Sequence, residues 1–352
     1  MKQFRNICIC RIDRMGDLII STPVIKIIRK IWPNSNITLL ASSLNAKVLE
    51  KSSLIDETII IENKSDIFKN YKNLKKIQRK SFDLFLNLSP TKLSYFLCFF
   101  SKAETKATLI YLSRYKKKFS KIFYIILTKI YCDYFTIINR KKLFKKNITF
   151  HQTKMMINLI EKITKKELEE LKIEIPSKNI LSDKIQGFSK KEIITIHLSN
   201  RWLNKYYNIN NLINLIGKLQ KTTKYLFFLT TENLGYEVFN DLISQYKEIK
   251  ISDFDNNEII SKKLLTSNIF VLKNFNYEHW IQIIKCSKKV ITPESGCTHI
   301  ASAFNVHTIV IYNYDNLPEY IYREYGPWKC SHNKLVFAKN NDINFQITSL
   351  IN

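Results

Sequence analysis

The pattern of hydrophobic and polar positions predicts short buried strands that alternate with amphipathic helices. Strands are expected over residues 6–12, 37–41, 58–61, 82–88, 107–111, 193–197, 225–230, 268–272, 290–292 and 308–312. Helical spacing marks residues 20–31, 44–51, 66–79, 91–101, 151–163, 209–221, 235–246 and 277–286. In the first of these, Pro23 allows either a helix that begins there after a Thr22 cap or a helix kinked there. The alternation predicts an α/β protein with parallel sheets covered by helices on both faces.

The periodic pattern is lost between Lys172 and Lys191, where Pro, Gly, Ser and charged residues collect. We therefore expect an N-terminal domain over residues 1–180 and a C-terminal domain over residues 181–352, both Rossmann-like. A chain of 352 residues is long enough for two such domains. Two parallel sheets joined once predict a cleft between their carboxyl edges, which is where sheets of this class bind ligands.

The chain lacks an apolar run that would predict a membrane-spanning helix. Its most hydrophobic stretch, Phe119–Ile138, is interrupted by Lys121, Lys129 and Asp133. The N-terminus enters a strand pattern directly and has no signal-peptide cleavage site, so a cytoplasmic protein is expected. The seven cysteines are scattered without CxxC pairs, which fits reduced thiols and gives no zinc-ligand spacing.

The net charge of +26 indicates attraction to an anionic partner. Only nine of the 56 basic residues are arginine, although arginine is the residue that reads bases and clamps phosphates. One interpretation is a compositional preference for lysine. The other is a basic surface, because residues 101–150 carry 13 Lys and Arg against Glu104 and Asp133, interleaved with apolar side chains. Such a segment is typical of a membrane-surface element, and Lys116, Lys117 and Lys118 stand at its centre.

The stretch Lys289–Ala303 reads as an apolar strand, a tight polar turn and the start of a helix. Unpaired N–H groups and the positive end of the helix dipole favour an anion at such a turn. Ser295 suits helix capping and Gly296 has no Cβ to hold a ligand away. The same residues would equally make an ordinary strand-to-helix connection.

Three other loops follow predicted strands. Asp17, in the RIDRMGD turn, is either an acid favoured by a helix dipole or a positioned base. In LSNRWLNKYY, Ser199, Arg201 and Lys205 would supply a hydroxyl and two cations to a phosphate or belong to a solvated basic loop. Thr231 and Glu232 end another strand and are weaker candidates for contacting a nucleoside. No GxGxxG or P-loop motif is present.

Four motifs together resemble the heptosyltransferase family, glycosyltransferase family 9. They are RIDRMGDLIISTP, HLSNRWLNKYY, PESGCTHIASAFNV and YGPW, in that order along most of the chain. The resemblance implies the GT-B fold, in which two Rossmann-like domains face each other across a cleft. It also implies an inverting glycosyltransferase that needs no metal and no cofactor, and that moves heptose from ADP-heptose onto the lipopolysaccharide core.

The resemblance also assigns roles to residues. The family's catalytic aspartate falls on Asp17, and its donor-phosphate ligands fall on Ser199 and Lys205. Its D-[ST]-G-x-x-H motif falls on Glu294, Ser295, Gly296 and His299, with Glu in place of Asp. His299 would donate to the pyrophosphate or be an ordinary helix histidine. The Gly-Pro-Thr-Asp usual after the next strand is replaced by residues 313–316, so another nucleotide-sugar or acceptor is the nearest alternative.

The partners expected from this resemblance are a nucleotide-sugar, an anionic lipopolysaccharide precursor and the inner face of the bacterial cytoplasmic membrane. Lys116, Lys117 and Lys118 are expected to meet the acceptor and the membrane. A remote alternative from another class is a nucleic-acid-binding protein, suggested by the charge alone. Its arginines and aromatics should line one groove, whereas the arginines here are scattered along the chain.

Overall fold

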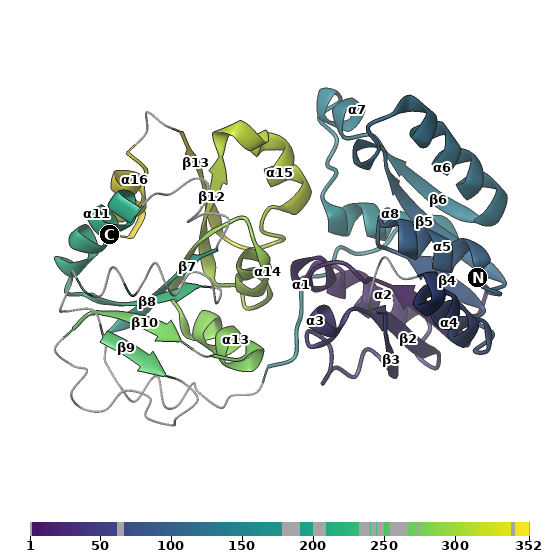
Figure 1. The fold of residues 1–352 in the computed structure, drawn as a ribbon, viewed down its shortest axis with the longest axis horizontal. Coiled ribbons are helices and arrows are strands. Elements are labelled where there is room, and N and C mark those ends of the chain that lie inside the picture. The colour runs from purple at the N-terminus through teal and green to yellow at the C-terminus, as the bar shows by residue number, and fades with distance from the viewer. Residues whose placement is uncertain are drawn as a thin grey trace. The chain divides into compact units, whose positions relative to one another are not determined.

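A computed structural model describes residues 2–61, 67–177, 191–199, 209–231, 240, 244, 250–253, 267–273, 275–338 and 342–351. The chain divides into two compact units, each built on one sheet (Figure 1). The first unit comprises Met1–Pro176 and Arg323–Tyr325, and the second comprises Ser177–Tyr322 and Gly326–Asn352. The domain boundary predicted between residues 180 and 181 lies outside the described residues.

The first unit contains a six-stranded sheet in the order β3-β2-β1-β4-β5-β6, and all its pairs are parallel. Its strands are β1 (Asn6–Cys10), β2 (Asn36–Ala41), β3 (Glu57–Ile60), β4 (Leu84–Asn87), β5 (Thr105–Tyr111) and β6 (Tyr134–Ile138). Its helices are α1 (Met15–Ile19), α2 (Thr22–Ile31), α3 (Ser43–Ala46), α4 (Ile67–Gln78), α5 (Lys92–Phe100), α6 (Lys118–Tyr131), α7 (Arg140–Lys145) and α8 (Gln152–Thr164), with a 3₁₀ turn at Leu112–Arg114.

Helices cover this first sheet in two groups. Apolar residues of α4, α5 and α6 form one cluster with inward side chains of β1, β2 and β4. Helices α2 and α8 contact each other, and the Thr153 hydroxyl of α8 donates to the carbonyl of Ile20 at 2.8 Å. Pro23 lies in the first turn of α2, where its missing N–H costs no hydrogen bond, and α2 runs as one helix from Thr22. Ser21 and not Thr22 is the N-cap, so the predicted Thr22 cap is wrong.

The second unit contains a seven-stranded sheet in the order β13-β12-β11-β7-β8-β10-β9, and its pairs are again parallel. Its strands are β7 (Glu192–Leu198), β8 (Tyr225–Thr231), β9 (Lys250–Asp253), β10 (Ile269–Lys273), β11 (Lys289–Pro293), β12 (His307–Asn313) and β13 (His332–Phe337). The helices in its sequence are α11 (Ile209–Gln220), α13 (Tyr277–Cys286), α14 (Gly296–Ala303), α15 (Pro318–Tyr325) and α16 (Ile343–Ile351), with a 3₁₀ turn at Tyr314–Asn316. One core cluster joins the sheet to α11 and α16, and a second joins its other face to α13.

The predicted α/β class with parallel sheets is confirmed, but several elements differ from the expectation. Helix α3 ends at Ala46, and its expected continuation consists of turns in which Val48 and Leu49 donate to carbonyls three residues back. Strands β6, β9 and β13 and helices α6, α7, α15 and α16 were not predicted. Most of the helix expected over residues 235–246 lies outside the described residues.

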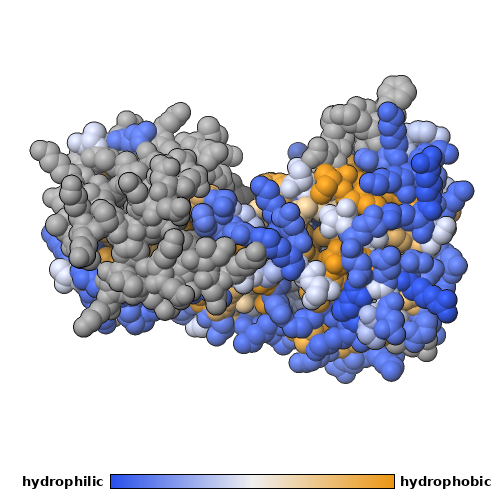
Figure 2. Space-filling view, turned by 90° about the horizontal axis from the view of Figure 1, so that it is seen from below, coloured by the Kyte–Doolittle hydropathy of each residue, from blue (hydrophilic) through white to orange (hydrophobic). Residues whose placement is uncertain are grey.

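The surface shown in Figure 2 is mostly hydrophilic where residues are described, with hydrophobic areas exposed between them. No helix in the described part of the chain is long and apolar enough to cross a membrane. None of the seven cysteines, which all lie in the described part of the chain, forms a disulfide bond.

Candidate active site

Each sheet has one place where the direction of winding reverses. In the first sheet, β2 and β3 lie on one side of β1 and the later strands on the other, so this switch point lies between β1 and β4. In the second sheet, it lies between β7 and β11 for the same reason. Open parallel sheets bind ligands outside the carboxyl ends of the strands at such points. The loops after β1, β4, β7 and β11 are therefore the candidate ligand positions of their units.

Arg11 follows β1 directly and is only 1% exposed. Its Nη1 donates to the carbonyl oxygen of Leu88, at the end of β4, and to Asp13 Oδ2 at 3.2 Å. Its Nε donates to the backbone carbonyl of Asp17 at 3.0 Å. A buried charge is tolerated only when it is paired and hydrogen-bonded, and Arg11 has both kinds of partner. The guanidinium thus spans the switch point and positions the turn that follows β1.

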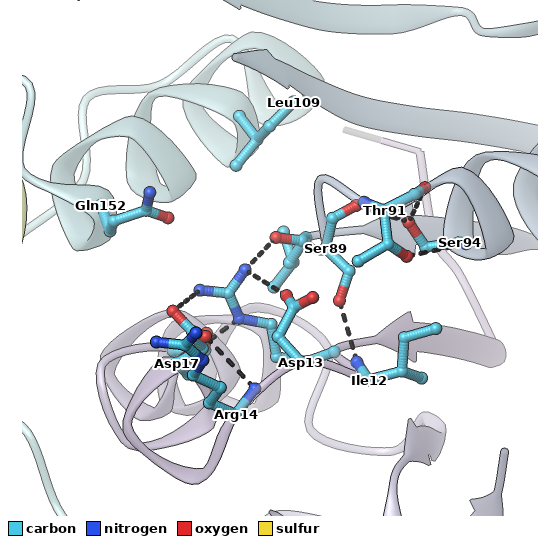
Figure 3. Close-up of polar contacts among 12 residues, drawn as sticks. Ile12, Asp13, Arg14, Asp17, Ser89, Thr91, Ser94, Leu109 and Gln152 are labelled. Carbon is cyan, nitrogen blue, oxygen red and sulfur yellow. Dashed lines mark hydrogen bonds and ion pairs between the residues drawn. The ribbon is translucent and has the colours of Figure 1, made fainter. Parts of the chain in front are cut away.

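Asp17 lies in the first turn of α1. Its Oδ2 accepts the backbone N–H of Arg14 at 3.2 Å, as a first-turn acid does (Figure 3). Its Oδ1 lies 3.5 Å from Nη2 of Arg11, within ion-pair distance, but Nη2 makes no hydrogen bond. The side chain of Asp17 is 20% exposed. Asp17 therefore caps α1 and still presents part of its carboxylate to solvent, so the two interpretations of this residue are compatible.

Asp13 lies on the other side of the same guanidinium, and its side chain is 12% exposed (Figure 3). Burial raises the pKa of Asp13, although the charge of Arg11 lowers it in part. Two carboxylates in different surroundings thus flank one buried cation. From the sequence only Asp17 is predicted as a base, although Asp13 is a second acid in the same RIDRMGD turn.

The loop after β4 completes this region. Ser89 Oγ accepts the backbone N–H of Ile12 at 2.8 Å, and its own backbone N–H donates to Asn87 Oδ1 at 3.2 Å. Ser94, in the first turn of α5, donates from its hydroxyl to the carbonyl of Ser89 at 2.6 Å. From α3, the side-chain amide of Asn45 donates to the carbonyl of Arg11 at 2.7 Å. These bonds hold the turn after β1 against β4 and α3, so its carboxylates are fixed in place.

A set of polar contacts inside the first unit involves the end of α15. Glu324 is 2% exposed and accepts from Arg140 Nη1 and, at 3.1 Å, from Gln152 Nε2. The hydroxyl of Tyr325 accepts from Gln152 Nε2 at 3.1 Å and from Arg114 Nη2 at 3.3 Å. We name these five residues the α15 polar cluster.

Electrostatics connect the α15 polar cluster with the turn after β1. Burial raises the pKa of Tyr325, and the carboxylates of Glu324 and Asp17 raise it further. Tyr325 begins the YGPW motif, but the sequence predicts no role for Glu324 or Tyr325. More than 170 residues separate Gln152 from its two partners in α15, so no local pattern signals the contact.

In the second unit, the predicted strand, turn and helix of Lys289–Ala303 are present as β11 and α14. Ser295 is the N-cap of α14, and its Oγ accepts the backbone N–H of Cys297 at 3.3 Å. The hydroxyl of Thr292 lies 3.1 Å from Ser295 Oγ. Ser295 and Gly296 are partly exposed, so the start of α14 is accessible at the carboxyl edge of the sheet.

The register of β7 and β11 brings two other predicted residues to this edge. Ile196 pairs with Ile291, and Ser199 and Glu294 each follow three residues later. Ser199 is 6% exposed, whereas Glu294 is partly exposed. The switch point of the second sheet is therefore lined by a hydroxyl, a carboxylate and the start of a helix.

The other predicted donor-site residues differ in accessibility. His299 is buried at 2% exposure in the second turn of α14. Thr231 ends β8 and is 4% exposed, and its hydroxyl donates to the carbonyl of Leu198 at 2.7 Å. Arg201, Lys205 and Glu232 lie outside the described residues.

Lys116, Lys117 and Lys118 lie in the first unit and are all exposed. Lys118 is the first residue of α6. They therefore belong to the surface of the first unit and not to the hydrogen-bonded turn around Arg11.

The two switch points offer complementary chemistry. A carboxylate paired with a guanidinium can accept a proton from a hydroxyl, and a helix N-terminus with nearby hydroxyls can stabilise an anion. In the described parts of the chain, no three His, Cys, Asp or Glu residues gather as ligands for a metal ion.

The family model of glycosyltransferase family 9 (heptosyltransferase) matches residues 71–351. None of the curated proteins matches the chain.

Many solved structures share the fold, among them the following three. A family 9 glycosyl transferase from Veillonella parvula is 16% identical, with a TM-score of 0.72, over 99% of this chain and 89% of that one. The ADP-heptose lps heptosyltransferase II of E. coli is 12% identical, with a TM-score of 0.68, over 99% and 98%. E. coli heptosyltransferase WaaC with ADP is 11% identical, with a TM-score of 0.68, over 98% of both chains. The predicted GT-B class of two Rossmann-like domains is confirmed.

Proposed function

Because the chain belongs to glycosyltransferase family 9, we propose that this glycosyltransferase moves heptose from ADP-heptose onto a lipopolysaccharide core acceptor, with inversion and without a metal or other cofactor. The acceptor would be met at the inner face of the bacterial cytoplasmic membrane. The structures of E. coli heptosyltransferase II and of WaaC with ADP support a nucleotide-sugar of this kind through the shared fold.

The observation that carries the proposal is the position of Asp17. Its carboxylate is partly exposed at the switch point of the first sheet, and Arg11 and the N–H of Arg14 orient it. In the proposed reaction, Asp17 accepts the proton of the acceptor hydroxyl while the hydroxyl oxygen bonds to the anomeric carbon of the sugar. The bond from that carbon to the diphosphate breaks on the opposite face, so the configuration inverts.

The leaving diphosphate needs stabilisation because it departs with negative charge. We assign this role to Ser199, Lys205 and the start of α14 at Ser295 and Gly296, with His299 as a further donor. Thr231 and Glu232 would contact the nucleoside, and Glu294 would contact sugar hydroxyls. The switch point between β7 and β11 supports the assignment, since Ser199, Glu294 and Ser295 all lie there.

Titration calorimetry with ADP, UDP and GDP tests the donor. We expect ADP to bind at least about tenfold more tightly than the others, a difference of about 1.4 kcal/mol. Product formed from ADP-heptose should carry the inverted anomeric configuration by NMR. If UDP or GDP binds more tightly than ADP, the donor is a sugar linked to that nucleotide and not ADP-heptose.

The Glu294→Asp variant tests the sugar. If Glu294 selects a sugar other than heptose, this variant should gain transfer from ADP-heptose while its ADP affinity stays the same. If Glu294 serves heptose as it stands, the variant should lose activity instead.

A further inference from the structure

One exposed face of α6 is apolar along the length of the helix. Phe119 is 77% exposed, Ile122 and Phe123 47% each, Ile126 51% and Ile130 67%. These positions follow helical spacing, so the five side chains share one face about 100° wide. The rings of Phe119 and Phe123 are stacked, with centroids 6.5 Å apart. We call these five residues the α6 stripe.

The opposite face of α6 is packed against the first unit. Thr128 is fully buried, and Tyr124 and Leu127 pack against the core cluster below α6. Helix α6 lies beside α5 (Figure 1), and the rings of Tyr124 and Tyr95 are 5.4 Å apart. The α6 stripe is therefore held on a fixed helix, and its exposure does not come from a frayed segment.

The charged residues on α6 and just before it have one sign. Lys116 and Lys117 precede α6, Lys118 is its first residue, and Lys121 and Lys129 lie within it. No Asp or Glu occurs between Thr105 and Cys132. A partner that covers this face must accept apolar side chains in its interior and cations around them, which an anionic lipid headgroup layer does.

We propose that the α6 stripe inserts into the headgroup layer of an anionic phospholipid membrane, with α6 parallel to the membrane surface. The proposal rests on the proposed function in that a lipid-linked acceptor brings the enzyme to such a surface. It adds the element that makes the contact and assigns the apolar side chains the anchoring role. The lysines contribute long-range attraction, which salt weakens, whereas the apolar contact persists in salt.

The test compares two triple variants of the full chain. Phe119→Gln, Phe123→Gln and Ile126→Gln remove the centre of the α6 stripe. The control, Leu44→Gln, Tyr71→Gln and Phe345→Gln, removes three apolar side chains that are exposed elsewhere, at 58%, 54% and 64%. Binding is measured by co-sedimentation with vesicles of phosphatidylcholine and phosphatidylglycerol in equal parts, and ADP binding is measured by calorimetry.

We expect the stripe variant to bind these vesicles at least about tenfold more weakly than the wild type, while the control variant binds normally. Both variants should bind ADP like the wild type. In a separate Phe119→Trp variant, indole emission should shift to the blue on addition of the vesicles and not on addition of ADP.

Two results would overturn the proposal. One is equal vesicle binding by the wild type and the stripe variant. The other is a wild-type dimer in analytical ultracentrifugation that becomes monomeric in the stripe variant while vesicle binding is unchanged, since the α6 stripe would then pack against a second copy. A chain that binds vesicles through the stripe but does not bind ADP would contradict the proposed function and leave this inference standing.

Discussion

Arg11 is the residue that connects the two carboxylates of the first switch point. Although burial opposes a positive charge, the carboxylates of Asp17 and Asp13 raise the pKa of Arg11, so the guanidinium stays charged. Because Arg11 also donates to the carbonyls of Leu88 and Asp17, its position is set by the backbone and does not depend on either carboxylate alone. A substitution in one carboxylate should therefore leave the other in place.

Asp17→Asn keeps the size of the side chain and removes the proton acceptor. We expect kcat for transfer to fall by about 10²–10⁴-fold, the usual contribution of one general base. The ADP affinity, measured by calorimetry, should be unchanged because Asp17 belongs to the first unit and the proposed donor residues to the second. The comparison is Asp13→Asn: if this variant loses more activity than Asp17→Asn, the base is Asp13.

The buried side chain of His197 makes the free energy of unfolding of the second unit depend on pH. Burial lowers the pKa of His197 to about 4 from 6.5, so the folded unit holds it neutral where the unfolded chain protonates it. The unfolded state therefore binds more protons between these values, and the free energy of unfolding falls as pH falls through them. Between pH 7 and pH 4.5 the wild type should lose about 2.5 kcal/mol more than His197→Gln. Urea titrations at both pH values measure this, and equal losses would contradict the shift.

At the scale of elements, the proposed binding of ADP at the start of α14 can be tested separately from the contribution of the N-cap to stability. Ser295→Ala removes the acceptor for the Cys297 N–H and should destabilise the second unit by about 1 kcal/mol. Asn276 caps α13 in the same unit by accepting the N–H of His279 at 2.9 Å, so Asn276→Ala is the matched control. We expect similar losses in urea titrations, but a weaker ADP affinity only for Ser295→Ala. If Ser295→Ala binds ADP as tightly as the wild type does, the turn at Ser295 only connects β11 to α14 and does not bind the donor.

Whether an element could be predicted from the sequence depends on which of its faces are buried. Strand β11 and helix α14 were predicted because a short, largely apolar strand is followed by a capping serine, and both signals are local. Helix α6 was not predicted because its α6 stripe adds a second apolar face, which obscures the usual contrast between buried and exposed positions. Strand β6 is an edge strand that is only partly buried, and its apolar residues follow α6 after only Cys132 and Asp133, so the sequence does not separate the two elements.

The candidate site was predictable in the same uneven way. Asp17, Ser199 and Ser295 each follow a predicted strand. Predicting the strands was therefore enough to place these residues at the carboxyl edges of the two sheets. The contacts of Glu324 and Tyr325 join segments that are far apart in sequence, and no pattern within either segment indicates them.

At the scale of the whole molecule, the net charge of +26 could act through its total or through the lysines at one place on the surface, and an experiment can separate the two. Changing Lys116, Lys117 and Lys118 to Gln removes three exposed charges next to the α6 stripe. Each lysine near an anionic surface contributes about 1 kcal/mol, so the loss of three should weaken binding to anionic vesicles by about 100-fold. Its salt dependence should become shallower and the KM for the lipid acceptor should rise.

Lys72, Lys75 and Lys76 provide the control for this experiment, because they are exposed on α4 in the same unit. Their change to Gln alters the net charge equally. If both triple variants weaken vesicle binding to the same extent, only the total charge matters and the basic residues around α6 have no special role.

Because Arg323–Tyr325 belong to the first unit, this unit cannot complete its folding until these residues near the end of the chain have been synthesised. The first segment of this unit ends at Pro176, and Glu324 is synthesised about 150 residues later, which takes about 8–30 s at ordinary translation rates. During that time Gln152 and Arg140 have no carboxylate partner from α15. The first half of the nascent chain can therefore form its sheet early but completes its polar interior only near the end of synthesis.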